Sequence, residues 1–200
     1  MTDIALGVRR AAWGTRVLAV VSGAVLVALA AQVSLPLPGT PVPMTLQPMA
    51  VLLVGGLLGG PLGALSMILY LAMGVAGLPV FTPTVPLVGV ARLLGPTGGY
   101  LLAYPVAAWV VGRLSDPGRK PGVQELASGV RESWVRIGFG VLAGLVLIHL
   151  GGLAQLAILT GSVSAAARFG TWPFLLGDLI KLGVLVPVLT KLTPTIRARL

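Results

Sequence analysis

Two charged residues of opposite sign, Asp178 and Lys181, stand in an otherwise apolar run and are the residues best able to do chemistry. The run reads FLLGDLIKLG from Phe174 onward. A charge at the centre of a membrane-spanning helix costs about 2.5–3.5 kcal/mol on insertion scales, so a retained charge usually faces a polar cavity or a partner. A spacing of three residues puts both on one helical face. The pair could offer a carboxylate and an ammonium group to a polar ligand, or could form a salt bridge that only neutralises both charges.

Few other residues suggest catalysis or metal binding. His149 is the single histidine and cysteine is absent, so these residue types cannot supply three ligands for a zinc ion or form a disulfide. The sequence has no Gly-x-Ser-x-Gly motif for a nucleophilic serine. His149 lies just before Gly151 and Gly152, which predicts a polar anchor at a helix end, with a proton relay as the alternative. We therefore expect neither an enzyme nor a cofactor.

The glycine-rich segment Gly95–Tyr100 (GPTGGY) resembles a phosphate-binding turn, because such turns expose backbone amides to anions. It lacks the Gly-Lys-Ser/Thr ending of a nucleotide-binding loop. If the protein moves a solute uphill, the energy must come from an ion gradient or from another protein.

The elements that position these residues are predicted to be hydrophobic helices. The chain of 200 residues is 56% hydrophobic and 10% charged, with a mean hydropathy of +0.99, whereas soluble domains carry roughly 25% charged residues. We predict an all-α integral membrane protein, a single domain over residues 1–200, built as a compact bundle of six transmembrane helices with proline-rich outer loops. The expected spans are 17–33, 46–58, 62–77, 97–112, 135–159 and 172–189.

Two features of these spans leave alternatives open. The first span follows three arginines and contains Ala28-Leu29-Ala30, so it could also be a signal peptide; its length and the charge pattern favour a helix that stays. The fifth span is expected to be tilted or broken near Gly151 and Gly152. Prolines at positions 36, 38, 41 and 43 exclude a helix between the first two spans.

The net charge of +9 comes from basic residues that flank apolar runs, which favours contact with membrane lipid and not with nucleic acid. Six spans place three basic segments on one face: Arg9, Arg10 and Arg16; Arg113, Arg119, Lys120, Arg131 and Arg136; Lys191, Arg197 and Arg199. Arg92 and Arg168 fall on the other. Because positive residues are retained on the cytoplasmic side, we expect a multi-pass membrane protein with both termini cytoplasmic.

Four motifs, in order and at matching spacing along nearly the whole chain, resemble the BioY family, the biotin-binding membrane subunits (S components) of energy-coupling factor (ECF) transporters. They are Pro41–Gln47 (PVPMTLQ), Gly77–Phe81 (GLPVF), Gly95–Tyr100 (GPTGGY) and Asp178–Lys181 (DLIK). The resemblance implies a bacterial or archaeal cytoplasmic membrane, high-affinity capture of biotin from outside, and uptake energised by a coupling module. That module consists of a transmembrane (T) subunit and two cytoplasmic ATPases.

The same resemblance implies the binding site. Asp178 and Lys181 would be the principal polar ligands of biotin, and Thr45, Gln47, Phe81, Gly98, Gly99 and Tyr100 would line or cap the pocket. Ala24 and Ala28, at small-xxx-small spacing, would form the docking face for the coupling subunit, although packing within the bundle is the alternative. One departure is the sequence Thr82–Pro86 in place of a glycine-rich stretch, which predicts a stiffer outer loop.

Two other functions remain open on the residues alone. One is a stand-alone ion-coupled or facilitative transporter of another small vitamin-like molecule. The other is a membrane enzyme, which the lack of a catalytic constellation disfavours. Asp178 is the only carboxylate expected inside a span, which weakens proton coupling.

Overall fold

The computed structural model describes residues 2–116 and 126–200, with side chains at 13–116 and 133–200. Arg119 and Lys120 lie outside the described residues, as do the side chains of Arg9, Arg10 and Arg131. The helices are α1 (Thr2–Gln32), α2 (Gln47–Leu58), α3 (Gly60–Val75), α4 (Val90–Leu94), α5 (Gly98–Leu114), α6 (Leu126–Thr160), α7 (Val163–Gly170), the 3₁₀ helix η2 (Trp172–Phe174) and α8 (Leu175–Arg197).

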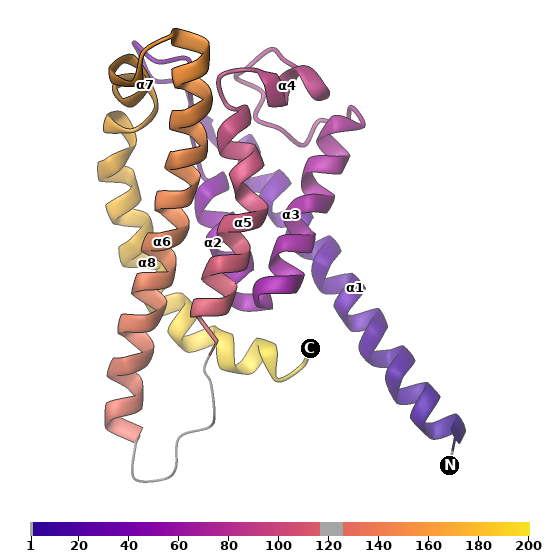
Figure 1. The fold of residues 1–200 in the computed structure, drawn as a ribbon. Helices are drawn as coiled ribbons and strands as arrows, with labels where there is room; N and C mark the ends of the chain where they lie inside the picture. Colours follow the sequence, from indigo (N-terminus) through magenta and orange to yellow (C-terminus); the bar gives the residue numbers. More distant parts are fainter. Residues whose placement is uncertain (1, 117–125) are drawn as a thin grey trace.

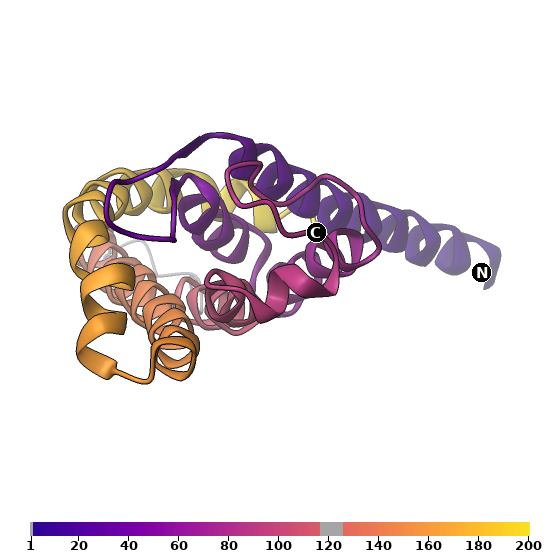
Figure 2. The ribbon, with the colours of Figure 1, turned by 90° about the horizontal axis from the view of Figure 1, so that it is seen from above.

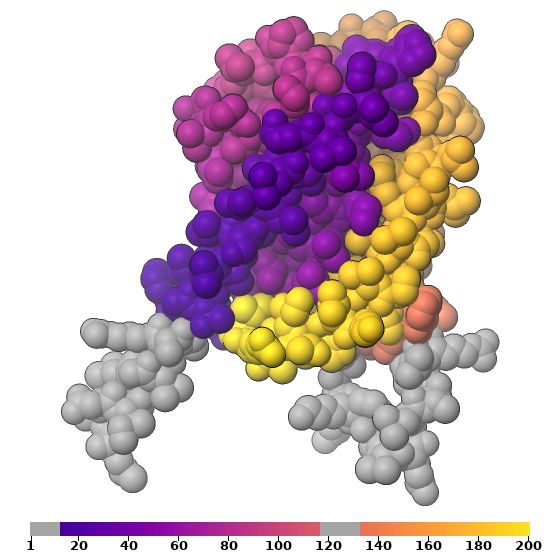
Figure 3. All heavy atoms as spheres, turned by 180° about the vertical axis from the view of Figure 1, so that it is seen from behind, coloured from indigo at the N-terminus to yellow at the C-terminus, as the bar shows by residue number. Residues whose placement is uncertain are grey.

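The helices α2, α3, α5, α6 and α8 run side by side, with α5 in contact with α2, α3 and α6 (Figure 1). The short helices α4 and α7 and the connecting loops cover one end, as the view from above shows (Figure 2). At that end, β1 (Ser34–Leu35) pairs antiparallel with β2 (Met44–Thr45), so the proline-containing segment returns on itself. On the far side, α1 runs obliquely across the face and the last part of α8 lies across the opposite end (Figure 3).

The starts of α2 and α3 follow from their prolines. Each helix has a proline in its first turn, Pro48 in α2 and Pro61 in α3, where the missing amide hydrogen has no helical partner to lose. Gly59 joins the two helices with a φ of 86°, a conformation that side-chain-bearing residues rarely adopt. This turn produces a tight hairpin of α2 and α3.

The expected break in the fifth span is wrong, because α6 continues through Gly151 and Gly152 to Thr160. Both glycines instead allow close packing against α5. A Cβ at Gly152 would overlap the Tyr100 ring, and one at Gly151 would lie 2.8 Å from the Cβ of Ala103. These glycines therefore serve the α5–α6 contact and do not interrupt the helix.

Three stretches of the described chain are long and apolar enough to cross a membrane: Trp13–Gln32, Ser133–Thr160 and Val163–Arg197. Two further apolar helices, α2 and α3, are shorter, with 12 and 16 residues. Apolar side chains such as Leu29, Phe139 and Leu179 cover much of the outer surface. This combination of apolar helices and apolar exterior fits an all-α membrane protein.

Candidate ligand-binding site

Both carboxylate oxygens of Asp178 are engaged by nitrogen atoms. Lys181 Nζ donates to Oδ1 at 2.8 Å, and His149 Nε2 lies 2.5 Å from Oδ2. Asp178 and Lys181 share one face of α8 and are each 7% exposed, whereas His149 comes from α6. A buried ammonium group is costly without a partner, so the Asp178 carboxylate satisfies the Lys181 charge where α6 packs on α8. The salt bridge and the ligand-binding alternatives are thus compatible, since all three side chains also line a pocket.

His149 lies inside α6 and not at a helix end, so its expected role as a helix-end anchor is wrong. Its ring packs edge-on to Tyr100, with ring centroids 6.3 Å apart, and lies 6.5 Å from Phe174. Nδ1 is buried and has no hydrogen-bond partner among the described residues. The ring is therefore held in place by aromatic neighbours and by Asp178.

A second buried cation, Arg92, reaches the pocket from α4 and is 1% exposed. Nη1 donates to the Val85 carbonyl oxygen at 2.6 Å, and Nη2 donates to that of Thr82 at 3.0 Å. The guanidinium carbon lies 5.9 Å from the Phe81 ring centroid. No ion pair among the described residues joins Arg92 to a carboxylate. Burial lowers the pKa of this guanidinium, but arginine starts so high that it stays charged at neutral pH.

A chain of polar contacts lines another side of the pocket. Gln47 Nε2, at the start of α2, donates to the Tyr70 hydroxyl at 2.5 Å, and that hydroxyl donates to the Val80 carbonyl at 3.3 Å. Thr45 Oγ1 accepts from the backbone nitrogen of Gln47 at 3.3 Å. The contacts connect α2, α3 and the following loop, so the amide side chain of Gln47 has a fixed orientation beside the cavity.

The pocket holds about 580 Å³ of space not occupied by atoms, a volume that includes its open mouth. Its wall combines the polar groups above with apolar and aromatic side chains. The lining residues are Val42, Pro43, Thr45, Gln47, Pro48, Thr82, Arg92, Thr97, Tyr100, Leu101, Tyr104, Leu145, Ile148, His149, Phe174, Asp178 and Lys181.

Five of the sequence-predicted site residues meet at this pocket: Thr45, Gln47, Tyr100, Asp178 and Lys181. Phe81, Gly98 and Gly99 are not among its lining residues. The Phe81 ring packs edge-on to that of Tyr70, with centroids 5.5 Å apart, and also contacts the Arg92 guanidinium. A Cβ at Gly98 would overlap the Leu93 carbonyl oxygen, and one at Gly99 would overlap that of Gly151. The two glycines therefore allow close backbone packing next to the pocket.

The predicted docking face is wrong for Ala24. Its side chain has no exposed surface and belongs to the buried core, and Ala28 is half-buried against the same core. The neighbouring Gly23 approaches α3 so closely that a Cβ there would lie 2.6 Å from Ser66 Oγ. These small residues bring α1 close to α3, and the outward side of α1 instead carries residues such as Leu18 and Leu29.

Sequence reasoning missed Arg92, Tyr104 and Phe174, and it did not place His149 in the site. Arg92 was counted only as a charge of an outer loop, yet an arginine between apolar residues in a proline-rich loop could have drawn notice. Tyr104 and Phe174 lie in apolar runs, where nothing local distinguishes a pocket wall from the core.

A bundle of apolar helices around a mostly apolar pocket, with a few buried charges and amides in its wall, is the arrangement of a ligand-binding membrane protein. A model of the BioY family matches residues 6–198 of this sequence. The chain belongs to the BioY family.

Individual relatives agree with this assignment. The chain is 37% identical over 152 residues to the "Probable biotin transporter BioY" of Pyrococcus horikoshii, covering 76% of this chain and 81% of that protein. It is 35% identical over 167 residues to the "Biotin transporter BioY" of Thermotoga maritima, covering 84% and 89%. The fold is similar, with a TM-score of 0.74 and 25% identity, to a crystal structure of the S-component for biotin from an ECF-type ABC transporter, covering 88% of this chain and 89% of that one.

Proposed function

We propose that this chain is a biotin-binding membrane subunit that captures biotin from outside the cell and mediates its uptake, energised by a separate ATPase-containing coupling module. The names of its relatives are those of transporters and not of enzymes. The observation that carries the proposal is a pocket with buried charges from two separate elements, Arg92 from α4 and the Asp178–Lys181 pair from α8.

The chemistry of biotin matches this wall. Its ureido ring offers two N–H donors and a carbonyl acceptor, and its side chain ends in a carboxylate. Asp178 can accept from the ureido nitrogens and Lys181 can donate to the ureido oxygen. Arg92 has no carboxylate partner among the described residues, so it is the natural site for the ligand carboxylate. Tyr100, Tyr104 and Phe174 would enclose the apolar ring and chain.

We further propose a single domain with six membrane spans, provided by α1, α2, α3, α5, α6 and α8. The 12 residues of α2 cover only about 18 Å, short of the ~30 Å hydrocarbon core. The non-helical segment 33–46 would supply the remaining depth above α2. Irregular backbone is tolerated at membrane depth where it lines a protein cavity, and Val42, Pro43 and Thr45 do line the pocket.

The orientation and the partners follow from the same proposal. The end with the pocket would face outside, and the end with both termini and the basic residues would be cytoplasmic. An ECF module, with a transmembrane subunit and two ATPases, would supply the energy, which accords with the structural likeness to an S-component of such a transporter. The exposed face of α1, which carries Leu18 and Leu29, would be the docking surface for the transmembrane subunit.

Thermal unfolding of the purified protein in detergent tests the ligand. Biotin should raise Tm in a concentration-dependent manner, while lipoate, thiamine and riboflavin at equal concentration should not, because binding to the folded state alone stabilises it. Folded protein that biotin fails to stabilise would contradict the proposal, as would equal stabilisation by lipoate, which lacks the ureido ring.

A further inference from the structure

The three tyrosines of the chain differ in what their hydroxyl groups contact. The Tyr70 hydroxyl accepts from Gln47 at 2.5 Å, and the Tyr100 hydroxyl donates to the Gly170 carbonyl oxygen at 2.6 Å. The Tyr104 hydroxyl has no hydrogen-bond partner among the described residues, although this residue lines the pocket and is only 3% exposed. A buried hydroxyl without a partner is costly, so a group held in the pocket is expected to complete it.

The two tyrosines of the pocket wall belong to different parts of it. Tyr104 lies four residues after Tyr100, so both face the pocket from successive turns of α5. The Tyr100 ring packs beside His149, with centroids 6.3 Å apart, and lies within electrostatic range of Asp178. Tyr104 lies within electrostatic range of Arg92. Tyr104 is therefore placed to act together with the arginine of α4.

Donors outnumber acceptors in the part of the wall around Arg92. Arg92 Nε and the Thr97 hydroxyl are buried and have no hydrogen-bond partner within the described part of the chain. The Tyr104 hydroxyl adds a third group that can donate. An anion that accepts several hydrogen bonds would satisfy such a wall, and a carboxylate has this character.

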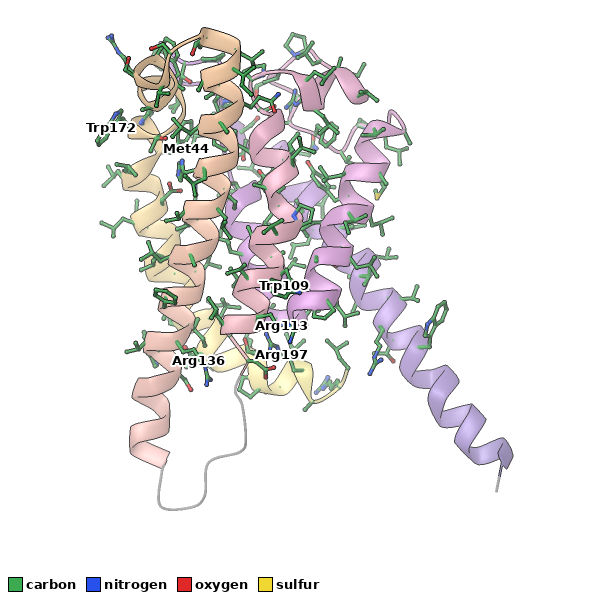
Figure 4. All side chains as sticks on the ribbon, in the orientation of Figure 1. Met44, Trp109, Arg113, Arg136, Trp172 and Arg197 are labelled. Carbon is green, nitrogen blue, oxygen red and sulfur yellow. The ribbon has the colours of Figure 1, made fainter. Side chains whose placement is uncertain are left out.

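Three other arginines are too distant to serve a ligand in the pocket. Arg113, Arg136 and Arg197 lie at the opposite end of the bundle from Met44, as Figure 4 shows. The residues on both sides of Met44 line the pocket, so the pocket belongs to the Met44 end. Lys181 lines the pocket too but is already paired within α8. A carboxylate in the pocket therefore depends on the arginine of α4 and on neutral donors near it.

We propose that the Tyr104 hydroxyl donates to the carboxylate of biotin alongside Arg92, and that it makes the pocket selective for a ligand whose carboxylate is free. This inference rests on the proposed function. A hydrogen bond to a charged acceptor is roughly twice as strong as one to a neutral acceptor, so the hydroxyl distinguishes an acid from its ester. Tyr104 sits on a helix and not on a loop, which holds the donor in a defined position.

Isothermal titration calorimetry of the whole protein in detergent, with biotin and with biotin methyl ester, tests this role. Tyr104→Phe removes only the hydroxyl, so the affinity for biotin should fall about tenfold or more, as expected for losing a hydrogen bond to a charged group. The loss for the methyl ester should be several-fold smaller, because its neutral carbonyl accepts a weaker hydrogen bond. Without ligand, Tm of Tyr104→Phe should not fall below that of wild type.

Tyr100→Phe is the matched control, because it removes the same atom from the same helix and the same pocket. Its hydroxyl already donates to the Gly170 carbonyl oxygen. The control should therefore lower Tm of the protein without ligand, and it should change the affinities for biotin and for the ester by the same factor.

The outcomes separate this inference from the proposed function. If wild type binds biotin, then unchanged biotin affinity in Tyr104→Phe, or an equal loss for biotin and its ester, would overturn the role of Tyr104 alone. A lower Tm of unliganded Tyr104→Phe would also overturn it, since the hydroxyl would then serve the fold. Folded wild-type protein that does not bind biotin would overturn both the inference and the proposed function.

Discussion

At the residue scale, the site is organised by one carboxylate that two nitrogen groups share. Asp178 meets Lys181 on its own helix and His149 on the adjacent one, so its orientation is set before any ligand arrives. A preoriented acceptor reduces the ordering cost of binding. This explains how residues that hold each other can also hold a ligand.

The Asp178–Lys181 pair gives the first prediction. Asp178→Asn and Lys181→Ala should each weaken biotin affinity by about tenfold to about a hundredfold, the range for losing a hydrogen bond that involves a charged group. Isothermal titration calorimetry in detergent measures the change. Arg199→Ala, an exposed residue outside the pocket, is the control. Wild-type affinity in both pocket variants would show that the pair is structural only.

Arg92 gives a prediction that separates the two ends of the ligand. Arg92→Gln should weaken binding of biotin by about tenfold or more, because a charge-assisted contact to the carboxylate is lost. The same substitution should change the affinity for biotin methyl ester much less, since the ester has no charge to pair. If both compounds lose affinity equally, Arg92 acts on the shape of the loop and not on the carboxylate.

Asp178 and Lys181 were predictable because charges in an apolar run stand out locally. Arg92 was not, since its burial depends on how segment 82–92 folds back to place the Thr82 and Val85 carbonyls around the guanidinium. Gly98 and Gly99 were predicted to line or cap the pocket, but nothing in their sequence distinguishes contact with a ligand from the close packing against Leu93 and Gly151 that the structure has.

At the element scale, small residues set the distances between helices. The Ala24 position shows that a small-xxx-small pattern identifies a close helix contact but not the partner. Gly151 and Gly152 likewise suggested a break in α6, but in the structure they are where α5 packs closely against α6. Glycine weakens a helix only by about 1 kcal/mol, which tertiary packing readily outweighs.

The corrected role of Ala24 leads to a stability prediction. Ala24→Trp should lower Tm by several degrees or prevent folding, because the indole would have to enter a filled core between α1 and its neighbours. Leu29→Trp, on the exposed side of the same helix, should leave Tm close to that of wild type. Circular dichroism melting in detergent compares the two. An Ala24→Trp protein as stable as wild type would contradict the buried position of Ala24 and would indicate that this side chain lies on the outer surface.

Arg197, near the ends of α2 and α5, gives a second prediction at the element scale. Arg197→Met would leave the Gly56 and Gly112 carbonyl oxygens without this donor, and we expect a loss of about 2–4 kcal/mol from two charge-assisted hydrogen bonds. Arg197→Lys should recover only part, because an ammonium group lacks the planar fork of the guanidinium. Chemical denaturation with far-ultraviolet detection measures both. If the Arg197→Met variant were as stable as wild type, this role of Arg197 would be refuted.

At the scale of the whole molecule, the pocket is made by the end of the bundle that is least regular. Its wall comes from the 33–46 segment and the start of α2, from the 82–97 region that includes α4, and from α5, α6, η2 and α8. Composition and charge sufficed to predict an all-α membrane protein, because helices surrounded by lipid must be apolar and must carry few charges. The path of the loops over the pocket could not be predicted, since it depends on contacts such as that between Gln47 and Tyr70 that join distant parts of the chain.

The most direct measurement is a structure of this protein with biotin bound. The account predicts the ureido ring at Asp178 and Lys181, the carboxylate within hydrogen-bond distance of Arg92, and the apolar ring between Tyr100 and Phe174. Biotin found outside this pocket, or inside it with Arg92 and Asp178 both out of contact, would contradict the account.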